Sequence, residues 1–218
     1  MYLNLPYKLG MTSLTFLDLP GEIRNQIYHQ LIVLPSLSGP KSFSDTPIYP
    51  EILHTCRKIH EEARQILYGC NTFFAHANLL TGLPRLRPNF NTISRPNLIS
   101  MIRRYYIRVR LDCDPNFSAK NAKEAFTGVE ELTLDVFQAQ FGSSDHEVLK
   151  LFEGIRDVKK ATIYGSITGF PEYANWLETS MMTPEGIEVP GYGEIETSNV
   201  RTYEIWTVSG NMACFERS

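Results

Sequence analysis

The stretch Ile52–Phe73, ILHTCRKIHEEARQILYGCNTF, carries a clear helical pattern. At about 100° per residue, its apolar and small side chains fall in one narrow sector, and most of its charged side chains lie outside that sector. Gly69 follows the pattern and is the expected helix stop. The stretch therefore predicts an amphipathic helix that buries one side, formed by Leu53, Cys56, His60, Ala63 and Leu67 and flanked by Ile52, Ile59 and Ile66.

The inner HEEAR of this stretch is one residue away from H-E-x-x-H, the pattern of zinc proteases. That pattern needs two histidines one helical turn apart, and here the second position is Arg64, a cation that cannot bind zinc. His60 points into the apolar sector, so we expect a buried histidine and not a metal ligand. The other histidines have no partner at ligand spacing, and the sequence predicts no metal site and no cofactor.

A second helix is predicted upstream, from Pro20 to Val33. Asp18 and Pro20 occupy the positions of a cap and a first-turn proline, and Pro35 ends the pattern. Between the two helices, residues 36–50 are rich in Pro, Gly and Ser and predict a surface loop. One stripe of the upstream helix is apolar and must be covered by another surface: Leu19, Ile23, Ile27 and Leu31, with Tyr28 at its edge.

Both helices contain a Glu-x-Arg motif, Glu22-Ile23-Arg24 in the first and Glu62-Ala63-Arg64 in the second. Together with their surroundings, these motifs resemble a large set of fungal proteins with an F-box-like domain that is defined by two Glu-x-Arg motifs. The resemblance covers residues 16–75. Its supporting motifs are Leu19-Pro20, Thr55-Cys56-Arg57, Leu67-Tyr68-Gly69 and Asn71-Thr72-Phe73.

The doubled motif also has a physical interpretation. Arg24 falls close to the apolar stripe of the first helix, and Glu62 and Arg64 flank the buried sector of the second. A cross-helix pair between a guanidinium and a carboxylate would fix how the two helices pack. The alternative is that the charges of both motifs are ordinary solvated residues, which contribute about 0–1 kcal/mol per exposed pair.

In F-box proteins, a helix that begins with Leu-Pro docks on a Skp-type adaptor of a cullin ubiquitin ligase. The resemblance therefore implies a non-enzymatic protein–protein interaction module that links an unknown target protein to such a ligase. Its partner-binding residues would be Leu19, Pro20, Ile23, Ile27 and Leu31, and its structural motif Glu22, Arg24, Cys56, Arg57, Glu62, Arg64, Tyr68, Asn71 and Phe73. The alternative is a stand-alone scaffold or binding protein whose front helices pack only on each other.

Three later segments share an apolar pattern of the form apolar-x-x-apolar-x-apolar, at residues 101–111, 128–137 and 157–167. Equivalent positions are 27 and then 29 residues apart, and helical patterns at 118–126 and 143–155 lie between them. Ser118 is the expected cap of the first helix, and Glu147 suits a capping box in the second. The pattern predicts a short parallel sheet with helices on one side, built either as degenerate leucine-rich repeats or as an ordinary α/β domain.

The expected fold class is α+β, with an N-terminal F-box-like helical region packed as one unit with an α/β part of strand–helix units. Other expected elements are a loop with a short helix within 76–100, a helix at 170–182 and a strand at 199–210. The expected divisions are a lead-in at residues 1–15, the helical region at 16–75 and the α/β region at 76–218.

Composition argues against several classes of protein. The formal net charge of -3 and the lack of long runs of like charge argue against nucleic acid as a partner. The four cysteines form no C-x-x-C pair, which favours free thiols in the cytoplasm or nucleus. We find no signal-peptide pattern and no membrane-spanning run of apolar residues. No known catalytic motif occurs, so we expect no enzymatic activity and no catalytic residues.

Overall fold

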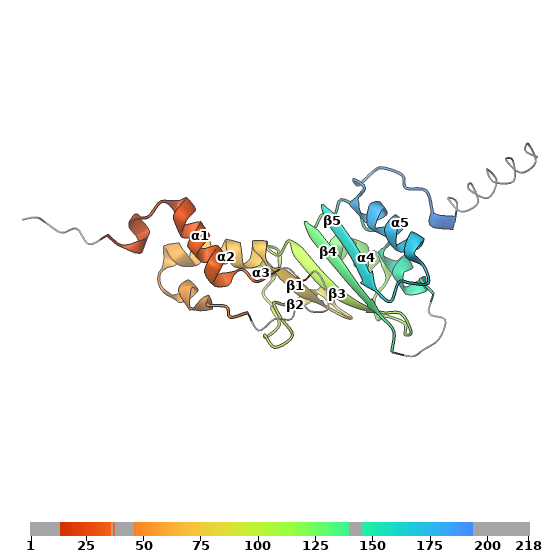
Figure 1. The fold of residues 1–218 in the computed structure, drawn as a ribbon, viewed down its shortest axis with the longest axis horizontal. Coiled ribbons are helices and arrows are strands. Elements are labelled where there is room, and N and C mark those ends of the chain that lie inside the picture. The colour runs from red at the N-terminus through yellow and green to blue at the C-terminus, as the bar shows by residue number, and fades with distance from the viewer. Residues whose placement is uncertain (1–13, 36, 38–45, 140–144, 194–218) are drawn as a thin grey trace, which may run out of the picture. The chain divides into compact units, whose positions relative to one another are not determined.

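The computed structural model describes residues 14–35, 37, 46–139 and 145–193. The strand predicted at 199–210 and most of the predicted lead-in lie outside these ranges. The chain divides into two compact units. The described residues of the first unit end at Leu67, and the second unit contains Leu37 and the described residues from Tyr68 onward. We treat each unit by itself; Figure 1 gives the element labels.

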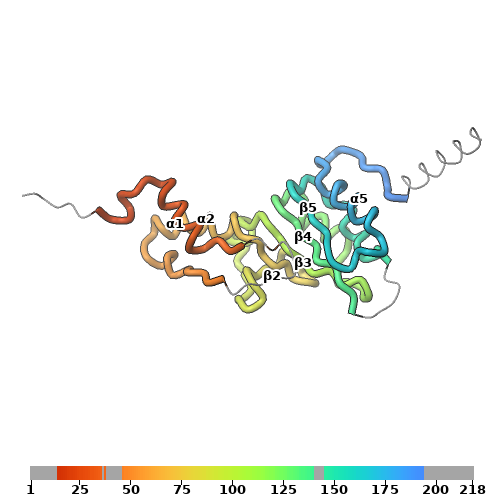
Figure 2. Tube along the Cα trace, viewed as in Figure 1, coloured from red at the N-terminus to blue at the C-terminus, as the bar shows by residue number. Residues whose placement is uncertain are grey.

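In its described residues, the first unit consists of helix α1 (Gly21–Ile32) and most of helix α2 (Arg57–Cys70). A 3₁₀ turn precedes each helix, η1 at Phe16–Asp18 and η2 at Pro50–His54. Figure 2 shows the path of the chain through them. Both predicted helices are present, but η2 occupies the start of the second prediction, so α2 begins several residues later than expected.

The start of α1 also differs from the prediction. Pro20 stands at the N-cap position, and Asp18 belongs to the preceding turn. There the Asp18 carboxylate accepts hydrogen bonds from the backbone N–H and the hydroxyl of Thr15, both at 2.8 Å. Asp18 therefore closes η1 and does not cap the helix.

Packing of α1 uses a different face from the one predicted. Arg24, Tyr28 and Ile32 are buried, in a row with a spacing of four residues. Ile23, Ile27 and Leu31 of the predicted apolar stripe each precede one of these residues by one position, and Ile23 is exposed. Long side chains with polar tips can be buried when those tips find partners. A count of apolar residues cannot show such partners, which is why the prediction chose the neighbouring face.

Helix α2 is buried at Ile59, Ala63 and Leu67. His60 and Cys56 were predicted to share this buried sector, and both are exposed. For Cys56 the prediction was wrong because the α-helix begins only at Arg57. His60 nevertheless has a partner, since its Nδ1–H donates to the Leu53 carbonyl at 2.9 Å.

A five-stranded mixed sheet forms the second unit, in the order β2-β1-β3-β4-β5. Strands β3 (Arg104–Arg110), β4 (Glu131–Phe137) and β5 (Lys160–Gly165) are parallel neighbours, as predicted. Strand β1 (Thr72–His76) pairs with β3 in parallel and with the edge strand β2 (Leu80–Arg85) in antiparallel orientation. The chain is therefore a mixed α/β protein.

The three predicted strand segments stack in register. Tyr105 pairs with Leu132, and Leu132 pairs with Ala161 on the next strand. Two residues further along, Ile107 of β3 pairs with Leu134 of β4, and Leu134 pairs with Ile163 of β5. Every position that defined the shared pattern is buried: Ile102, Tyr105, Ile107, Val129, Leu132, Leu134, Val158, Ala161 and Ile163.

Helices α4 (Ala119–Phe126) and α5 (Pro171–Met182) lie on one side of the sheet (Figure 1). The ring of Phe126 links this layer to the strands, because its centroid is 5.7 Å from that of Tyr105. As predicted, Ser118 caps α4, and its Oγ accepts from the Asn121 N–H at 3.3 Å. Both helices were predicted at these positions.

The helix predicted at 143–155 is instead a 3₁₀ turn, η3, at Glu147–Phe152. The capping box that we expected at Glu147 is replaced by a simpler contact, in which the Asp145 carboxylate accepts from the Glu147 N–H at 3.1 Å. This contact starts a turn just before Glu147, which leaves a shorter element than the sequence pattern suggested.

The sequence did not predict β1 or β2. Within 76–100 we expected a loop and a helix near its start, but residues 80–85 form β2, and the short helix α3 lies later, at Pro96–Ile99. Pro84 lies within β2. It is tolerated because β2 is the sheet edge, where a missing backbone N–H need not leave a neighbouring strand unpaired.

Candidate functional site

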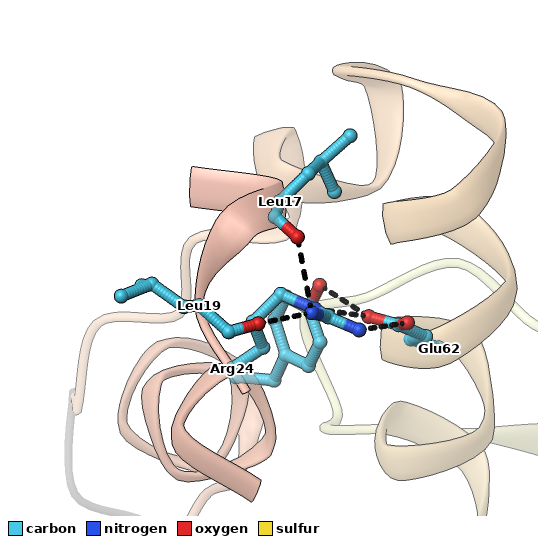
Figure 3. A network of polar contacts seen from close by, with 5 residues as sticks. Leu17, Leu19, Arg24 and Glu62 are labelled. Atoms are coloured by element: carbon cyan, nitrogen blue, oxygen red, sulfur yellow. Dashed lines mark hydrogen bonds and ion pairs between the residues drawn. The ribbon is translucent and has the colours of Figure 1, made fainter. Parts of the chain in front are cut away.

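Arg24 of α1 and Glu62 of α2 form an ion pair with two parallel hydrogen bonds (Figure 3). Arg24 Nε donates to Glu62 Oε2 at 2.9 Å, and Nη2 donates to Oε1 at 2.6 Å. Only 8% of the Arg24 side-chain surface is exposed. The predicted cross-helix pair is therefore confirmed, and it joins the arginine of the first motif to the glutamate of the second.

Tyr28 completes this cluster. Its hydroxyl donates to Glu62 Oε2 at 2.9 Å, and its ring centroid lies 5.8 Å from that of Phe16 in η1. Tyr28 follows Arg24 by four residues, the spacing that puts two side chains on the same face of a helix. We had placed Tyr28 only at the edge of an apolar stripe; its spacing from Arg24 was the signal that could have found it.

Arg24 also holds the backbone in front of α1. Its Nη1 donates to the carbonyl of Leu17 at 3.4 Å and to the carbonyl of Leu19. In Figure 3, both carbonyls point toward the guanidinium, while the two leucine side chains extend away from it. The cluster therefore fixes the segment that precedes the helix and turns its apolar side chains outward.

Each group of the cluster is held in one protonation state. Hydrogen bonding from Arg24 lowers the pKa of Glu62 to about 2. Burial, followed by the bond to Glu62, raises the pKa of Tyr28 to about 12. The bond to Glu62 also raises the pKa of Arg24. None of these three groups titrates near neutral pH, so the cluster is suited to holding structure and not to general acid–base catalysis.

The other charged residues of the motifs lie outside this cluster. Glu22 is exposed in the first turn of α1, and Cys56 and Arg57 are exposed at the start of α2. Arg64 is half-buried, and its Nε–H has no hydrogen-bond partner within the residues that the structure describes. Only one glutamate and one arginine of the doubled motif therefore form the cross-helix contact.

The closing residues of the motif belong to the second unit and serve packing. Asn71 and Phe73 are both buried. The ring of Tyr68 stacks on that of Phe73, with centroids 5.7 Å apart and planes 11° from parallel. These contacts lead the chain from α2 into β1.

Apolar side chains are exposed on the segment that Arg24 holds. Leu14 is 86% exposed, Leu17 39% and Ile23 41%. Pro20 is also exposed, and Leu19 is half-buried. We call Leu14, Leu17, Leu19, Pro20 and Ile23 the front surface.

The predicted partner-binding residues divide between the front surface and the helix behind it. Leu19, Pro20 and Ile23 belong to the front surface, whereas Ile27 and Leu31 are half-buried farther along α1. The structure thus shifts the candidate site toward η1 and the first turn of α1.

In the second unit, a network of polar side chains crosses one face of the sheet. The Tyr164 hydroxyl donates to the Tyr106 hydroxyl at 3.3 Å, and Tyr106 donates to Asp135 at 2.5 Å. Asp135 also forms an ion pair with Arg108 at 3.4 Å. Burial raises the pKa of Tyr106, which is fully buried against Phe74. These contacts give the polar side chains of neighbouring strands their hydrogen-bond partners. The sequence had not predicted this network.

A cavity of about 290 Å³ lies next to the carboxyl ends of β3 and β4. Its walls combine apolar residues such as Val109 and Phe137 with Arg108 and Arg110. Arg108 lies over the Phe137 ring at 4.4 Å, and Arg110 is held by Asp112 through two bonds of 2.8 Å. In open α/β sheets, ligands commonly bind at the carboxyl ends of the strands.

Among the described residues, no group of three or more His, Cys, Asp and Glu side chains is placed to hold a metal ion. The cysteines within these residues, Cys56, Cys70 and Cys113, are free thiols. None of the helices that the structure describes has both the length and the apolar character that a bilayer crossing requires.

Comparisons of this chain with protein-family models, with curated proteins and with solved structures gave no match. The functional interpretation therefore rests on the motifs of the sequence and on the geometry of the front surface.

Proposed function

We propose that this chain is a non-enzymatic, F-box-like interaction protein that links a target protein to a cullin ubiquitin ligase. In this proposal the front surface binds a Skp-type adaptor, and the second unit contacts the target. The observation that supports it most is the exposure of Leu17 and Ile23 on a backbone that the Arg24–Glu62 pair holds from behind.

The energetics of association favour such a surface. Burial of apolar area contributes about 25 cal/mol per Å² removed from water, so exposed leucine and isoleucine side chains are effective anchors for a partner. A surface whose backbone is already held loses less conformational entropy when it binds. The hydrogen bonds from Arg24 to the Leu17 and Leu19 carbonyls provide that preorganisation.

We propose that the second unit binds the target protein. The in-register stacking of β3, β4 and β5 supports a degenerate leucine-rich-repeat-like arrangement, in which successive strand–helix units build one extended surface. The cavity beside β3 and β4 suits an apolar side chain of the target, with Arg108 and Arg110 at its walls. We place this activity in the cytoplasm or nucleus, where the thiols of the chain would stay reduced.

One observation favours a second candidate, a stand-alone scaffold without a ligase partner. Ile27 and Leu31 are half-buried, so part of the predicted binding stripe is already covered within the chain. In that case the front helices would serve mainly to stabilise the protein, and only the second unit would bind a partner.

Co-purification distinguishes the two candidates. The full chain is co-expressed with a Skp-type adaptor and passed over a size-exclusion column, and we expect one joint peak. Changing Leu19, Pro20 and Ile23 together to polar residues should remove the adaptor from that peak. An intact complex after this change would contradict the adaptor-binding proposal and favour the scaffold.

A matched single variant controls for general loss of apolar surface. Ile23→Asp should weaken the complex, because its side chain is 41% exposed on the front surface. Ile187→Asp should leave the complex intact, since that isoleucine is 56% exposed and belongs to the second unit. Equal effects of the two changes would count against a localised site.

A further inference from the structure

A hollow of about 450 Å³ lies on the first unit where α2 begins, and the proposed function does not use it. It is lined by residues of η2 and of the first turns of α2. Its lining includes two charged residues of the doubled-motif region, Arg57 and Arg64, which have no part in the Arg24–Glu62 cluster.

Among the residues that the structure describes, the two guanidinium groups of this hollow have no acceptor. Arg57 and Arg64 are seven residues apart, so they project from the same side of α2 two turns from each other. Within the described chain, neither forms an ion pair, either with Glu61 in the same hollow or with another carboxylate. The Nε–H of Arg64 is buried without a hydrogen-bond partner in that same part of the chain. The guanidinium of Arg64 is therefore not fully satisfied within the described residues.

One wall of the hollow is fixed by His60. Its Nδ1–H donates to the Leu53 carbonyl at 2.9 Å, which ties η2 to α2. The wall therefore keeps its shape without a ligand. The first turn of α2 also carries the partial positive charge of a helix N-terminus, which adds to the two arginine charges.

We propose that this hollow binds a phosphate group. Two guanidinium charges against the single carboxylate of Glu61 leave a net positive lining. A carboxylate ligand would be saturated by one guanidinium fork, whereas a phosphate group has three terminal oxygens and close to two negative charges at neutral pH. Arg57 and Arg64 can therefore share it. This inference does not depend on adaptor binding, because it concerns other residues of the first unit.

The test is an NMR titration of the full chain with inorganic phosphate at neutral pH and constant ionic strength. We expect the Arg64 Nε–H resonance to shift with saturation, and sodium acetate to cause a much weaker shift. A phosphoserine peptide of glycine and alanine, compared with its unphosphorylated form, shows whether the site also accepts a phosphate carried by a protein. If neither phosphate nor the phosphopeptide moves this resonance, the proposal is overturned.

Four substitutions in α2 test whether phosphate binding depends on the charges that line the hollow. Arg57→Gln and Arg64→Gln should each weaken phosphate binding about tenfold, the loss expected for a charged hydrogen bond. Glu61→Gln should strengthen it, because a repelling carboxylate is removed. Lys58→Gln removes the same positive charge from a residue that does not line the hollow, so binding should stay within about twofold. Equal weakening by Lys58→Gln and Arg57→Gln, or weaker binding by Glu61→Gln, would overturn the site.

Discussion

Arg24 is nearly buried and replaces water with bonds to Glu62 and to two backbone carbonyls, whereas the Glu62 side chain stays 25% exposed. A partly buried ion pair gains little net stability over apolar packing, but removal of one partner leaves a charge without compensation. Its value here is geometric, since the guanidinium sets the α1–α2 packing and holds the Leu17 and Leu19 carbonyls at once.

Removal of the Tyr28 hydroxyl tests the smallest part of this cluster. Tyr28→Phe should lower the free energy of unfolding by about 1.5 kcal/mol, the contribution of a hydrogen bond to a charged acceptor. In a Glu62→Gln background the same change should cost about 1 kcal/mol less, because the two groups are coupled. Urea unfolding of the wild type, the two single variants and the double variant gives the double-mutant cycle.

Tyr49→Phe is the matched control, since Tyr49 is 52% exposed. It should change stability by less than about 0.5 kcal/mol. Strict additivity of Tyr28→Phe and Glu62→Gln would show that the hydroxyl and the carboxylate do not interact.

Acid should weaken the cluster in a defined window. The pKa of Glu62 is about 2 in the folded chain and 4.5 for an ordinary glutamate, so its contribution is fully present above pH 4.5. The unfolded chain binds the proton first as pH falls, and the contribution is lost progressively toward pH 2. The stability difference between wild type and Glu62→Gln should therefore shrink across this window.

Glu22→Gln provides the comparison, because Glu22 is an exposed glutamate of the other motif. Its difference from wild type should stay within about 0.5 kcal/mol, the range expected for an exposed side chain. A wild-type to Glu62→Gln difference that does not change with pH would contradict the ion pair.

At the level of single residues, the sequence predicted the pair but not its surroundings. A guanidinium–carboxylate pair between the helices was one of two interpretations left open, and the structure shows it. Tyr28 was missed because a tyrosine in an apolar stripe reads as packing, and only its four-residue spacing from Arg24 shows the shared partner. Cys56 was misplaced because the α-helix begins only at Arg57, after the 3₁₀ turn.

At the level of elements, the local pattern predicted β3, β4 and β5 and missed β1 and β2. Strands β3, β4 and β5 were predicted because both their apolar spacing and their repeat distance are visible in the sequence. Strand β1 follows α2 directly and was taken as the end of the helical motif, and β2 falls where a short helix and a loop were expected. The pairing of β1 with β2 and β3 is decided by tertiary contacts, which no local pattern contains.

Gly165 at the end of β5 gives a test of the parallel sheet. Its φ is +106°, and a Cβ there would lie 2.1 Å from the Val136 carbonyl oxygen of β4. Gly165→Ala should therefore lower the free energy of unfolding by at least about 1–3 kcal/mol through backbone strain alone. Thermal unfolding measures the loss.

Gly169→Ala is the control for this change, because a Cβ on Gly169 would meet no atom within 4 Å and the φ of this glycine is not in the left-handed region. Its effect should stay within about 0.5 kcal/mol. Equal stability of the two alanine variants would show that β5 does not approach β4 as described.

At the level of the whole molecule, the two units carry different kinds of surface. The first unit presents the front surface and the arginine-lined hollow, and the second presents a sheet with a cavity beside two strand ends. The sequence predicted a helical region at 16–75 and an α/β region at 76–218, because the periods of their apolar patterns differ. It could not locate the front surface, since Leu17 and Ile23 become a site only through the bonds that Arg24 makes behind them.

Hydrogen exchange of the full chain, with and without a Skp-type adaptor, tests the central proposal most directly. We predict that adaptor binding slows exchange of the amides from Leu17 to Arg24 and leaves the amides of β3, β4 and β5 unchanged. Slower exchange in the sheet with no change from Leu17 to Arg24, or no change anywhere, would contradict the role assigned to the front surface.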